Sequence, residues 1–293
     1  MASPRILAIG AHPDDVDIKV GGTSALWRKH GCEVLLISVT DGSGGHQTMK
    51  GPELAQRRKA EAAVAGKIIG AEYRVLDFAD GALMPTLEAR HQIIRLIRNF
   101  KPDLVLTHRP NDYHPDHRYT SILVQDAAYL VTVPAICPDT PHLRANPVFG
   151  YFADDFRKPI PFHADIVVDV EPVFDSIMSM LDCHVSQFYE WLPYNGVFFD
   201  ALPENCNDRK AWLQKAMVEW IKPYADRFRD LVIQTYGLDK GEKVHLVEAF
   251  EISEYGGKLD AAKKAWLFPF LPSLSGDASA IEAIDYGDYR DDE

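Results

Sequence analysis

The chain has 293 residues, 46% of them hydrophobic and 25% charged, which is typical of a folded globular protein and unlike a disordered or fibrous one. Its formal net charge of −12 lacks the basic excess on which binding to nucleic acid or to an anionic membrane usually depends. We therefore expect a small-molecule partner, and neither nucleic acid nor a membrane.

The first half of the chain alternates short apolar runs with helical segments. Arg5–Gly10 and Glu33–Thr40 are rich in Ile, Val and Leu, which is typical of strands buried on both faces. Val16–His30 has room for a helix, and Gly31 stands where a glycine often ends one. The same scheme then predicts a helix at 52–69, a strand at 73–76, a helix at 87–99 after Thr86, and a strand at 104–107.

This alternation predicts an α/β fold with a Rossmann-like, mostly parallel, doubly wound sheet that carries helices on both faces. Ligands bind such sheets at the carboxyl ends of the strands. We expect residues 1–130 to form this core within one domain that spans residues 1–293.

After His117 the pattern loosens into proline-rich loops, so we expect an irregular C-terminal part. Strands are expected at 148–152, 166–170 and 244–252, and helices at 173–183 and 208–235. Residues 131–276 would form the wall and lid of the site. Residues 277–293 are acidic and would form a mobile tail or a strap between the subunits of a homo-oligomer.

The cysteines and the N-terminus bear on the location of the protein. Four cysteines are scattered without a Cys-x-x-Cys pair, which is unlike a disulfide framework or a zinc-thiolate site. The apolar stretch at 6–9 is too short for a signal peptide, and no apolar run is long enough to span a bilayer. A cytoplasmic protein is expected.

Two clusters of histidine and aspartate follow predicted strands. Ala11–Asp15 (AHPDD) comes directly after the first strand, and His114–His117 (HPDH) follows the strand at 104–107. Each cluster alone is equally consistent with a turn that caps a helix. Together they lie at one edge of a sheet, where two histidines and a carboxylate are a recurrent catalytic zinc set that leaves a fourth position for water.

Other catalytic signatures are missing. The chain has no Gly-x-Ser-x-Gly motif, and its cysteines have no obvious base partner. It also lacks the phosphate-binding Gly-x-Gly-x-x-Gly after its first strand, which argues against a nucleotide-binding Rossmann protein. Metal-activated water with a nearby carboxylate as base is the remaining mechanism.

The two clusters, AHPDD and HPDHR, resemble those of the LmbE-like (PIG-L) metal-dependent deacetylases, which act on N-acetylglucosamine-type and related amides. The resemblance extends to Thr40-Asp41-Gly42, to Arg58-x-x-Glu61 and to Glu248-Ala249-Phe250, and it covers most of the chain. It departs where many relatives carry Glu after the paired aspartates, because Val16 and then Asp17 follow here.

The resemblance implies one zinc ion per chain, or another divalent ion such as Fe²⁺, held by His12, Asp15 and His117. It also implies that Asp14 is the general base. His114, kept oriented and cationic by Asp116, would stabilise the oxyanion or the leaving group. Asp116 could instead orient His117.

Three further segments are candidates for substrate contact. Arg58 lies within a predicted helix and either reaches a site carboxylate or is a solvated charge. The glycine-rich loop that begins with Asp41 and Gly42 either brings backbone N–H groups to a ligand or is a plain turn. His184 precedes aromatic residues that suit a sugar ring or a packed core.

We therefore expect a zinc-dependent hydrolase that removes an acyl group, most simply acetyl, from an amide nitrogen of a small glycosyl substrate. An amidase acting on another C–N bond and a metal-binding protein without turnover are the alternatives. Asp14 and His114 argue against the latter, because holding zinc does not require them.

Overall fold

The computed structural model describes residues 2–196 and 202–272. The acidic segment 277–293, for which a tail or strap is expected, lies outside the described residues. Within the described ranges, no helix combines the length and the apolar character needed to cross a membrane.

A seven-stranded sheet forms the centre of the fold, in the order β3-β2-β1-β4-β5-β7-β6. The first five strands in this order are parallel, and β7 is antiparallel to both of its neighbours. The strands are β1 (Arg5–Gly10), β2 (Glu33–Thr40), β3 (Glu72–Phe78), β4 (Leu104–Thr107), β5 (Val148–Phe152), β6 (Ile166–Asp169) and β7 (Val247–Gly256). The expected open, mostly parallel sheet is confirmed, with an antiparallel strand that the sequence did not reveal.

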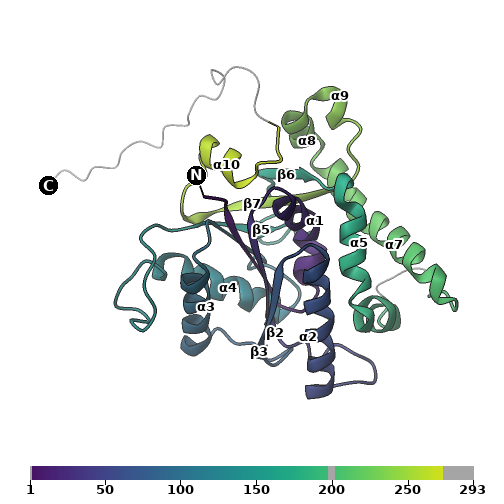
Figure 1. Cartoon of the computed structure of the whole chain (residues 1–293), viewed down its shortest axis with the longest axis horizontal. Coiled ribbons are helices and arrows are strands. Elements are labelled where there is room, and N and C mark those ends of the chain that lie inside the picture. The colour runs from purple at the N-terminus through teal and green to yellow at the C-terminus, as the bar shows by residue number, and fades with distance from the viewer. Residues whose placement is uncertain (1, 197–201, 273–293) are drawn as a thin grey trace.

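Helices cover both faces of this sheet, as expected (Figure 1). On one face lie α1, α2 and α5, and on the other lie α3 and α4. The helices are α1 (Asp15–Lys29), α2 (Gly51–Ile68), α3 (Leu87–Phe100), α4 (Pro115–Leu130), α5 (Phe174–Asp182), α6 (Leu192–Tyr194), α7 (Cys206–Arg227), α8 (Arg229–Tyr236), α9 (Leu238–Gly241) and α10 (Ala261–Leu267). A 3₁₀ turn, Glu171–Val173, precedes α5, and a π-helical segment, Ser186–Trp191, follows it.

The sheet separates two apolar cores because successive side chains of a strand point to opposite faces. In β1, Ile6 and Ala8 enter the core beneath α1 and α2, whereas Leu7 and Ile9 enter the core beneath α3 and α4. All four side chains are fully buried. This burial on both faces explains why β1 reads as one continuous apolar run.

The predicted helix ends are largely correct. Gly31 and Gly70 follow α1 and α2 with φ of 78° and 69°, the left-handed conformation that glycine adopts at low cost. Thr86 caps α3, because its side chain accepts a hydrogen bond from the Ala89 backbone N–H.

Three expectations for the second half were wrong. The chain is not irregular after His117, because α4 continues to Leu130 and buries Leu123, Val124 and Ala127 against α3. The single helix expected at 208–235 is two helices, since Phe228 between α7 and α8 leaves the helical conformation. The last strand runs from 247 to 256 rather than from 244 to 252.

Candidate metal centre and active site

The two histidine and aspartate clusters meet at the carboxyl edge of the sheet. The chain turns sharply after β1, where the carbonyl oxygen of His12 accepts hydrogen bonds from the N–H groups of Asp14 (2.9 Å) and Asp15 (3.2 Å). On the neighbouring strand, β4 leads into the loop that begins α4, and His114 is the N-cap of that helix. The adjacency of β1 and β4 therefore brings His12 and His117 together.

One nitrogen of His12, one nitrogen of His117 and the carboxylate of Asp15 converge at one point. His12 Nδ1 lies 3.2 Å from His117 Nε2 and 3.5 Å from Asp15 Oδ2, and His117 Nε2 lies 3.5 Å from Asp15 Oδ1. Tetrahedral zinc with bonds of about 2.0–2.1 Å separates its ligand atoms by about 3.3–3.4 Å. The distances between these atoms therefore fit a zinc ion, which histidine and aspartate side chains commonly bind.

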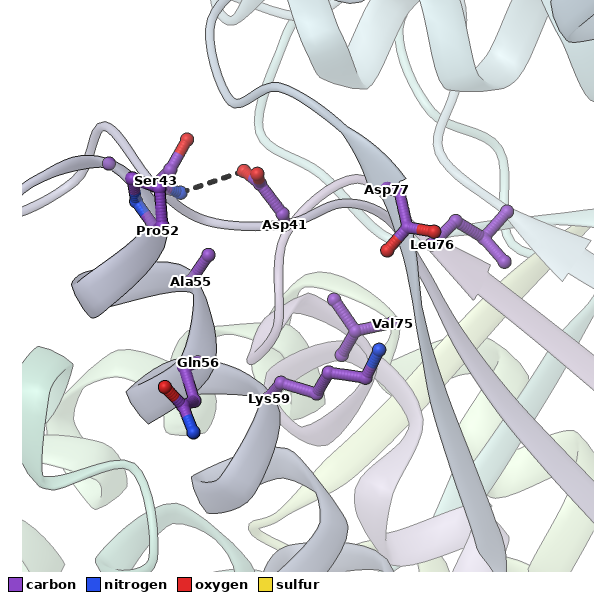
Figure 2. A pocket seen from close by; sticks show the side chains of 10 residues that line it. Asp41, Ser43, Pro52, Ala55, Gln56, Lys59, Val75, Leu76 and Asp77 are labelled. Atoms are coloured by element: carbon purple, nitrogen blue, oxygen red, sulfur yellow. Dashed lines mark hydrogen bonds between the residues drawn. The ribbon is translucent and has the colours of Figure 1, made fainter.

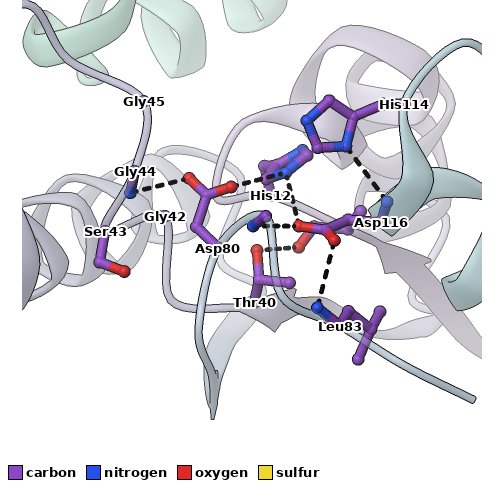
Figure 3. Close-up of polar contacts among 12 residues, drawn as sticks. His12, Thr40, Gly42, Ser43, Gly44, Gly45, Asp80, Leu83, His114 and Asp116 are labelled. Atoms are coloured by element: carbon purple, nitrogen blue, oxygen red, sulfur yellow. Dashed lines mark hydrogen bonds and ion pairs between the residues drawn. The ribbon is translucent and has the colours of Figure 1, made fainter.

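The outward nitrogens of both histidines face carboxylates. His12 Nε2 lies 3.2 Å from Asp80 Oδ1 and 3.4 Å from Asp116 Oδ2 (Figure 3). His117 Nδ1 lies 3.1 Å from Asp112 Oδ1. A carboxylate on the outer nitrogen fixes the orientation and the tautomer of a metal-ligating histidine. Both rings thus direct their free nitrogen inward.

Asp15 is held at the base of this cluster. Its Oδ2 accepts hydrogen bonds from the N–H groups of Ala11 (2.9 Å) and His12 (2.7 Å), and it lies 3.1 Å from His108 Nε2. Burial opposes ionisation, but the neighbouring His117 and His108 bring the pKa of Asp15 well below its usual range. Asp15 is therefore an anionic carboxylate at neutral pH and a candidate metal ligand.

His108 stacks on His117 and supports it. The ring centroids are 4.1 Å apart and the ring planes are nearly parallel, with an angle of 9° between them. Burial, and next the neighbouring His117, lower the pKa of His108 to about 4. A neutral ring can lie against a ligand histidine without repelling a cation.

More than one group of side chains in the described part of the chain could hold an ion. These groups are His12 with His114 and His117, Asp15 with His108 and His117, and His12 with Asp80 and Asp116. The set of His12, Asp15 and His117 overlaps all three. In this set the inward nitrogens of His12 and His117 face the Asp15 carboxylate, while their outward nitrogens keep the carboxylate contacts described above.

Asp14 is buried beside the cluster and is held by Arg58. Nη2 of Arg58 lies 3.1 Å from Asp14 Oδ1, and Nη1 lies 3.8 Å from Asp80 Oδ2. Burial raises the pKa of Asp14, although the Arg58 guanidinium opposes the rise. Arg58 is 2% exposed, so it is not a solvated helix charge and reaches the site carboxylates instead.

Asp41 and Gly42 shape the loop over Arg58. Asp41 Oδ1 accepts hydrogen bonds from the N–H groups of Ser43 (2.9 Å) and Asp80 (3.1 Å). Gly42 has a φ of 69°, and its carbonyl oxygen accepts a hydrogen bond from Arg58 Nη1, at 3.3 Å. A Cβ at Gly42 would lie 2.7 Å from the Arg58 side chain, so the close approach requires glycine.

The expected pairing of the Asp116 carboxylate with the His114 ring was wrong. His114 Nδ1 instead accepts a hydrogen bond from the Asp116 backbone N–H, at 3.2 Å. The Asp116 carboxylate accepts from the N–H groups of Gly81 and Leu83, and it faces His12 rather than orienting His117. Burial, with neighbouring His12 and His117, lowers the pKa of His114, so the ring is neutral rather than cationic.

His184 does not line the surface of the site. It is fully buried, and its Nε2 lies 3.2 Å from Oδ2 of Asp17, which is also fully buried. Burial disfavours its charged form, yet Asp17 and Asp14 together raise the pKa of His184. Its burial against Asp17 fits a structural role beneath the site better than a direct contact with substrate.

Three residues of the site were missed from the sequence: Asp80, His108 and Asp112 as a partner of His117. His108 follows β4 directly, and Asp80 lies two residues after β3. The rule that selected Asp14 and Asp15, polar residues at the carboxyl end of a strand, would have found both. The contact of Asp112 with His117 had no comparable signal, because it depends on the fold of the loop before α4.

A separate hollow of about 360 Å³ lies between the start of α2 and β3 (Figure 2). Asp41 and Ser43 line it on the side of the loop above Arg58, and Lys59 and Asp77 also line it. None of the three candidate metal ligands lines it. This hollow is therefore distinct from the candidate metal centre around His12.

Two sequence comparisons match this chain to known deacetylases. Residues 7–128 match the PIG-L family, described as GlcNAc-PI de-N-acetylase. Diacetylchitobiose deacetylase of Thermococcus kodakarensis is 33% identical over 207 residues, which cover 65% of this chain and 74% of that protein.

Solved structures share the fold. The hydratase GalB of Pseudomonas putida, which acts as a 4-carboxy-2-hydroxymuconate hydratase, has a TM-score of 0.68 at 18% identity, covering 88% of this chain and 99% of that one. N,N′-diacetylchitobiose deacetylase of Pyrococcus horikoshii has a TM-score of 0.64 at 22% identity, covering 86% and 84%. At these identities the likeness is one of fold.

Proposed function

Since the chain belongs to the PIG-L (GlcNAc-PI de-N-acetylase) family, we propose that it is a zinc-dependent N-deacetylase. Its substrate would be a small N-acetylated sugar or sugar conjugate, and one ion per chain would be held by His12, Asp15 and His117. The observation that carries the proposal is the convergence of their ligand atoms at 3.2–3.5 Å beside the buried carboxylate of Asp14. We place the enzyme in the cytoplasm and treat residues 1–293 as one catalytic domain.

The reaction is the hydrolysis of an acetamide to acetate and an amine. Zinc held by His12, Asp15 and His117 would supply Lewis acidity, which lowers the pKa of bound water to about 7 and polarises a carbonyl oxygen. Asp14 takes a proton from the attacking water and later delivers it to the departing nitrogen. Arg58 fixes the position of the Asp14 carboxylate and opposes the rise in its pKa that burial causes.

His114 stabilises the oxygen on which negative charge develops. Its Nδ1 accepts a hydrogen bond from the backbone of Asp116, so a neutral ring carries its proton on Nε2. That N–H is the donor to the oxyanion. Asp116, Asp80 and Asp112 position the ligand histidines, while Asp41 and Gly42 shape the loop above Arg58.

The test combines metal content with amine release. The purified protein is assayed for amine from N-acetylated sugars, with a chelator and after zinc is restored. Asp14→Asn is expected to keep the metal and to lose at least 100-fold in kcat, because general base catalysis typically contributes that much. His117→Ala should lose both, and Asp239→Asn, an exposed carboxylate on α9, should change neither.

The outcomes separate the alternatives. Chelator-sensitive amine release that depends on Asp14 supports the deacetylase. A relative of 24% identity is a 4-oxalmesaconate hydratase of Pseudomonas putida, so water addition to a carbon–carbon double bond is the second candidate. Metal binding with turnover only of an unsaturated acid would favour it, and a fully active Asp14→Asn protein would overturn the assigned base.

A further inference from the structure

Two aromatic side chains stack in the segment that follows α5. The rings of Trp191 and Tyr194 are 5.9 Å apart between centroids, with an angle of 25° between their planes. Trp191 is partly exposed and Tyr194 is 68% exposed. Their neighbours Phe188 and Tyr189, at 0% and 6% exposure, belong to the core. The aromatic cluster after His184 thus divides into a core pair and an outward pair.

Trp191 of the outward pair lies beside the candidate active site. A Cβ placed on Gly45 would be 3.7 Å from Trp191 Nε1, 3.7 Å from Asp80 Oδ2 and 3.3 Å from Arg58 Nη1. The Trp191 indole and the Asp80 carboxylate are therefore no more than twice 3.7 Å apart at these atoms. Asp80 in turn contacts His12, and Figure 3 shows Gly45 on the loop that passes Asp80.

Buried and half-buried polar contacts hold this segment against the loop. Glu190 accepts hydrogen bonds from Arg57 at 2.6 and 2.7 Å and lies 2.7 Å from His46 Nε2. Gln187 donates a hydrogen bond to the carbonyl oxygen of Gly45, at 3.0 Å. A surface that is fixed before a ligand arrives loses little conformational entropy on binding.

We propose that Trp191 and Tyr194 form a second sugar subsite, which binds a ring linked to the N-acetylated residue that is hydrolysed. The apolar face of a pyranose suits a flat, half-exposed aromatic surface, and the tryptophan and tyrosine polar groups can bond the hydroxyls at its rim. The Trp191 Nε1 position near Asp80 sets this ring next to the reacting centre. The inference rests on the proposed function and extends it to substrates with at least two linked rings.

The test compares a two-ring with a one-ring probe. N,N′-diacetylchitobiose and N-acetylglucosamine are assayed with the wild-type chain, Trp191→Ala, Trp191→Phe and Tyr194→Ala. The ratio of kcat/KM for the two probes should fall about tenfold in Trp191→Ala, equivalent to about 1.4 kcal/mol of stacking. Trp191→Phe keeps a ring and should recover most of this loss.

Tyr129→Ala is the matched control, because Tyr129 is 71% exposed near the end of α4 that lies away from the site. It should leave the ratio unchanged. Binding is measured in parallel by calorimetry with Asp14→Asn, which we expect to bind N,N′-diacetylchitobiose without hydrolysing it. In Asp14→Asn, N,N′-diacetylchitobiose should bind more tightly than N-acetylglucosamine. Loss of this difference when Trp191→Ala is added supports the subsite.

The two proposals fail in different ways. An unchanged ratio of kcat/KM and unchanged calorimetric affinity in both alanine variants would overturn the subsite while leaving the deacetylase intact. Absence of amine release from either probe, with the calorimetric effect of Trp191 retained, would overturn the proposed reaction and leave a two-ring binding site.

Discussion

Replacement of Arg58 by methionine should destabilise the protein strongly. Arg58 is 2% exposed, with Nη2 at 3.1 Å from Asp14 and Nη1 at 3.8 Å from Asp80 and 3.3 Å from the Gly42 carbonyl oxygen. Methionine fills much of the space but leaves two buried carboxylates without their cation. Breaking a buried ion pair by removing one partner typically costs about 3–5 kcal/mol.

Arg74→Met provides the matched control. Its Nε lies closer to a carboxylate than Arg58 does, at 2.6 Å from Glu72 Oε1, but the two side chains are 47% and 59% exposed. An exposed pair typically contributes about 0.2–1 kcal/mol. Burial rather than distance therefore decides the expected order of the two variants.

Urea unfolding of the metal-free proteins at pH 7.5 measures both changes, with the m value as a check on two-state behaviour. Arg58→Met should lower the free energy of unfolding by at least 2 kcal/mol more than Arg74→Met, by the ranges just given. It should also move the acidic limb of the kcat/KM profile to higher pH, because Arg58 holds down the pKa of Asp14. Equal losses of stability would refute the role assigned to this buried pair.

Three further changes test separate parts of the account. Asp112→Asn should weaken metal binding by about 10–100-fold in competition with a chelator, because Asp112 faces His117 Nδ1, and unchanged affinity would remove that role. Gly42→Ala should lower the free energy of unfolding by about 1–3 kcal/mol more than Gly31→Ala. Both glycines have positive φ, but only a Cβ at Gly42 would clash with Arg58. Equal melting temperatures of the two variants would contradict this. Burial raises the pKa of Glu248 to about 7, although hydrogen bonds from Thr23 and Gly22 oppose the rise. The stabilisation that Glu248 contributes is therefore complete below pH 4.5, its usual pKa, and is lost as the pH rises through 7. The stability advantage of the wild type over Glu248→Gln should therefore shrink by up to about 3 kcal/mol between pH 4.5 and pH 8, and a gap that widens would reverse the assignment.

The sequence predicted the parallel core because its strands are buried on both faces. The bounds of β1, β2, β4 and β5 were predicted to the residue, since uninterrupted apolar runs marked them. The helix α4 was not predicted, because its buried side chains alternate with polar ones and prolines follow it. The antiparallel β7 depends on pairing with strands distant in the chain, which no local pattern encodes.

The site could be predicted in part for the same reason. His12, Asp14 and Asp15 lie in one motif at a strand end, so the position of that strand placed them. The partners of each side chain depend on contacts between loops. Asp116 was expected to bind the His114 ring, but backbone N–H groups of residues 81 and 83 and the His12 ring compete for its carboxylate, and only the folded loop shows which contact prevails.

The central claim is that His12, Asp15 and His117 hold a divalent ion. Anomalous diffraction at the zinc edge, from crystals of the wild-type chain grown with zinc, tests it most directly. The account predicts one strong peak at about 2.0–2.2 Å from His12 Nδ1, His117 Nε2 and an Asp15 carboxylate oxygen. A peak between His12 Nε2, Asp80 and Asp116, or no peak in this cluster, would contradict it.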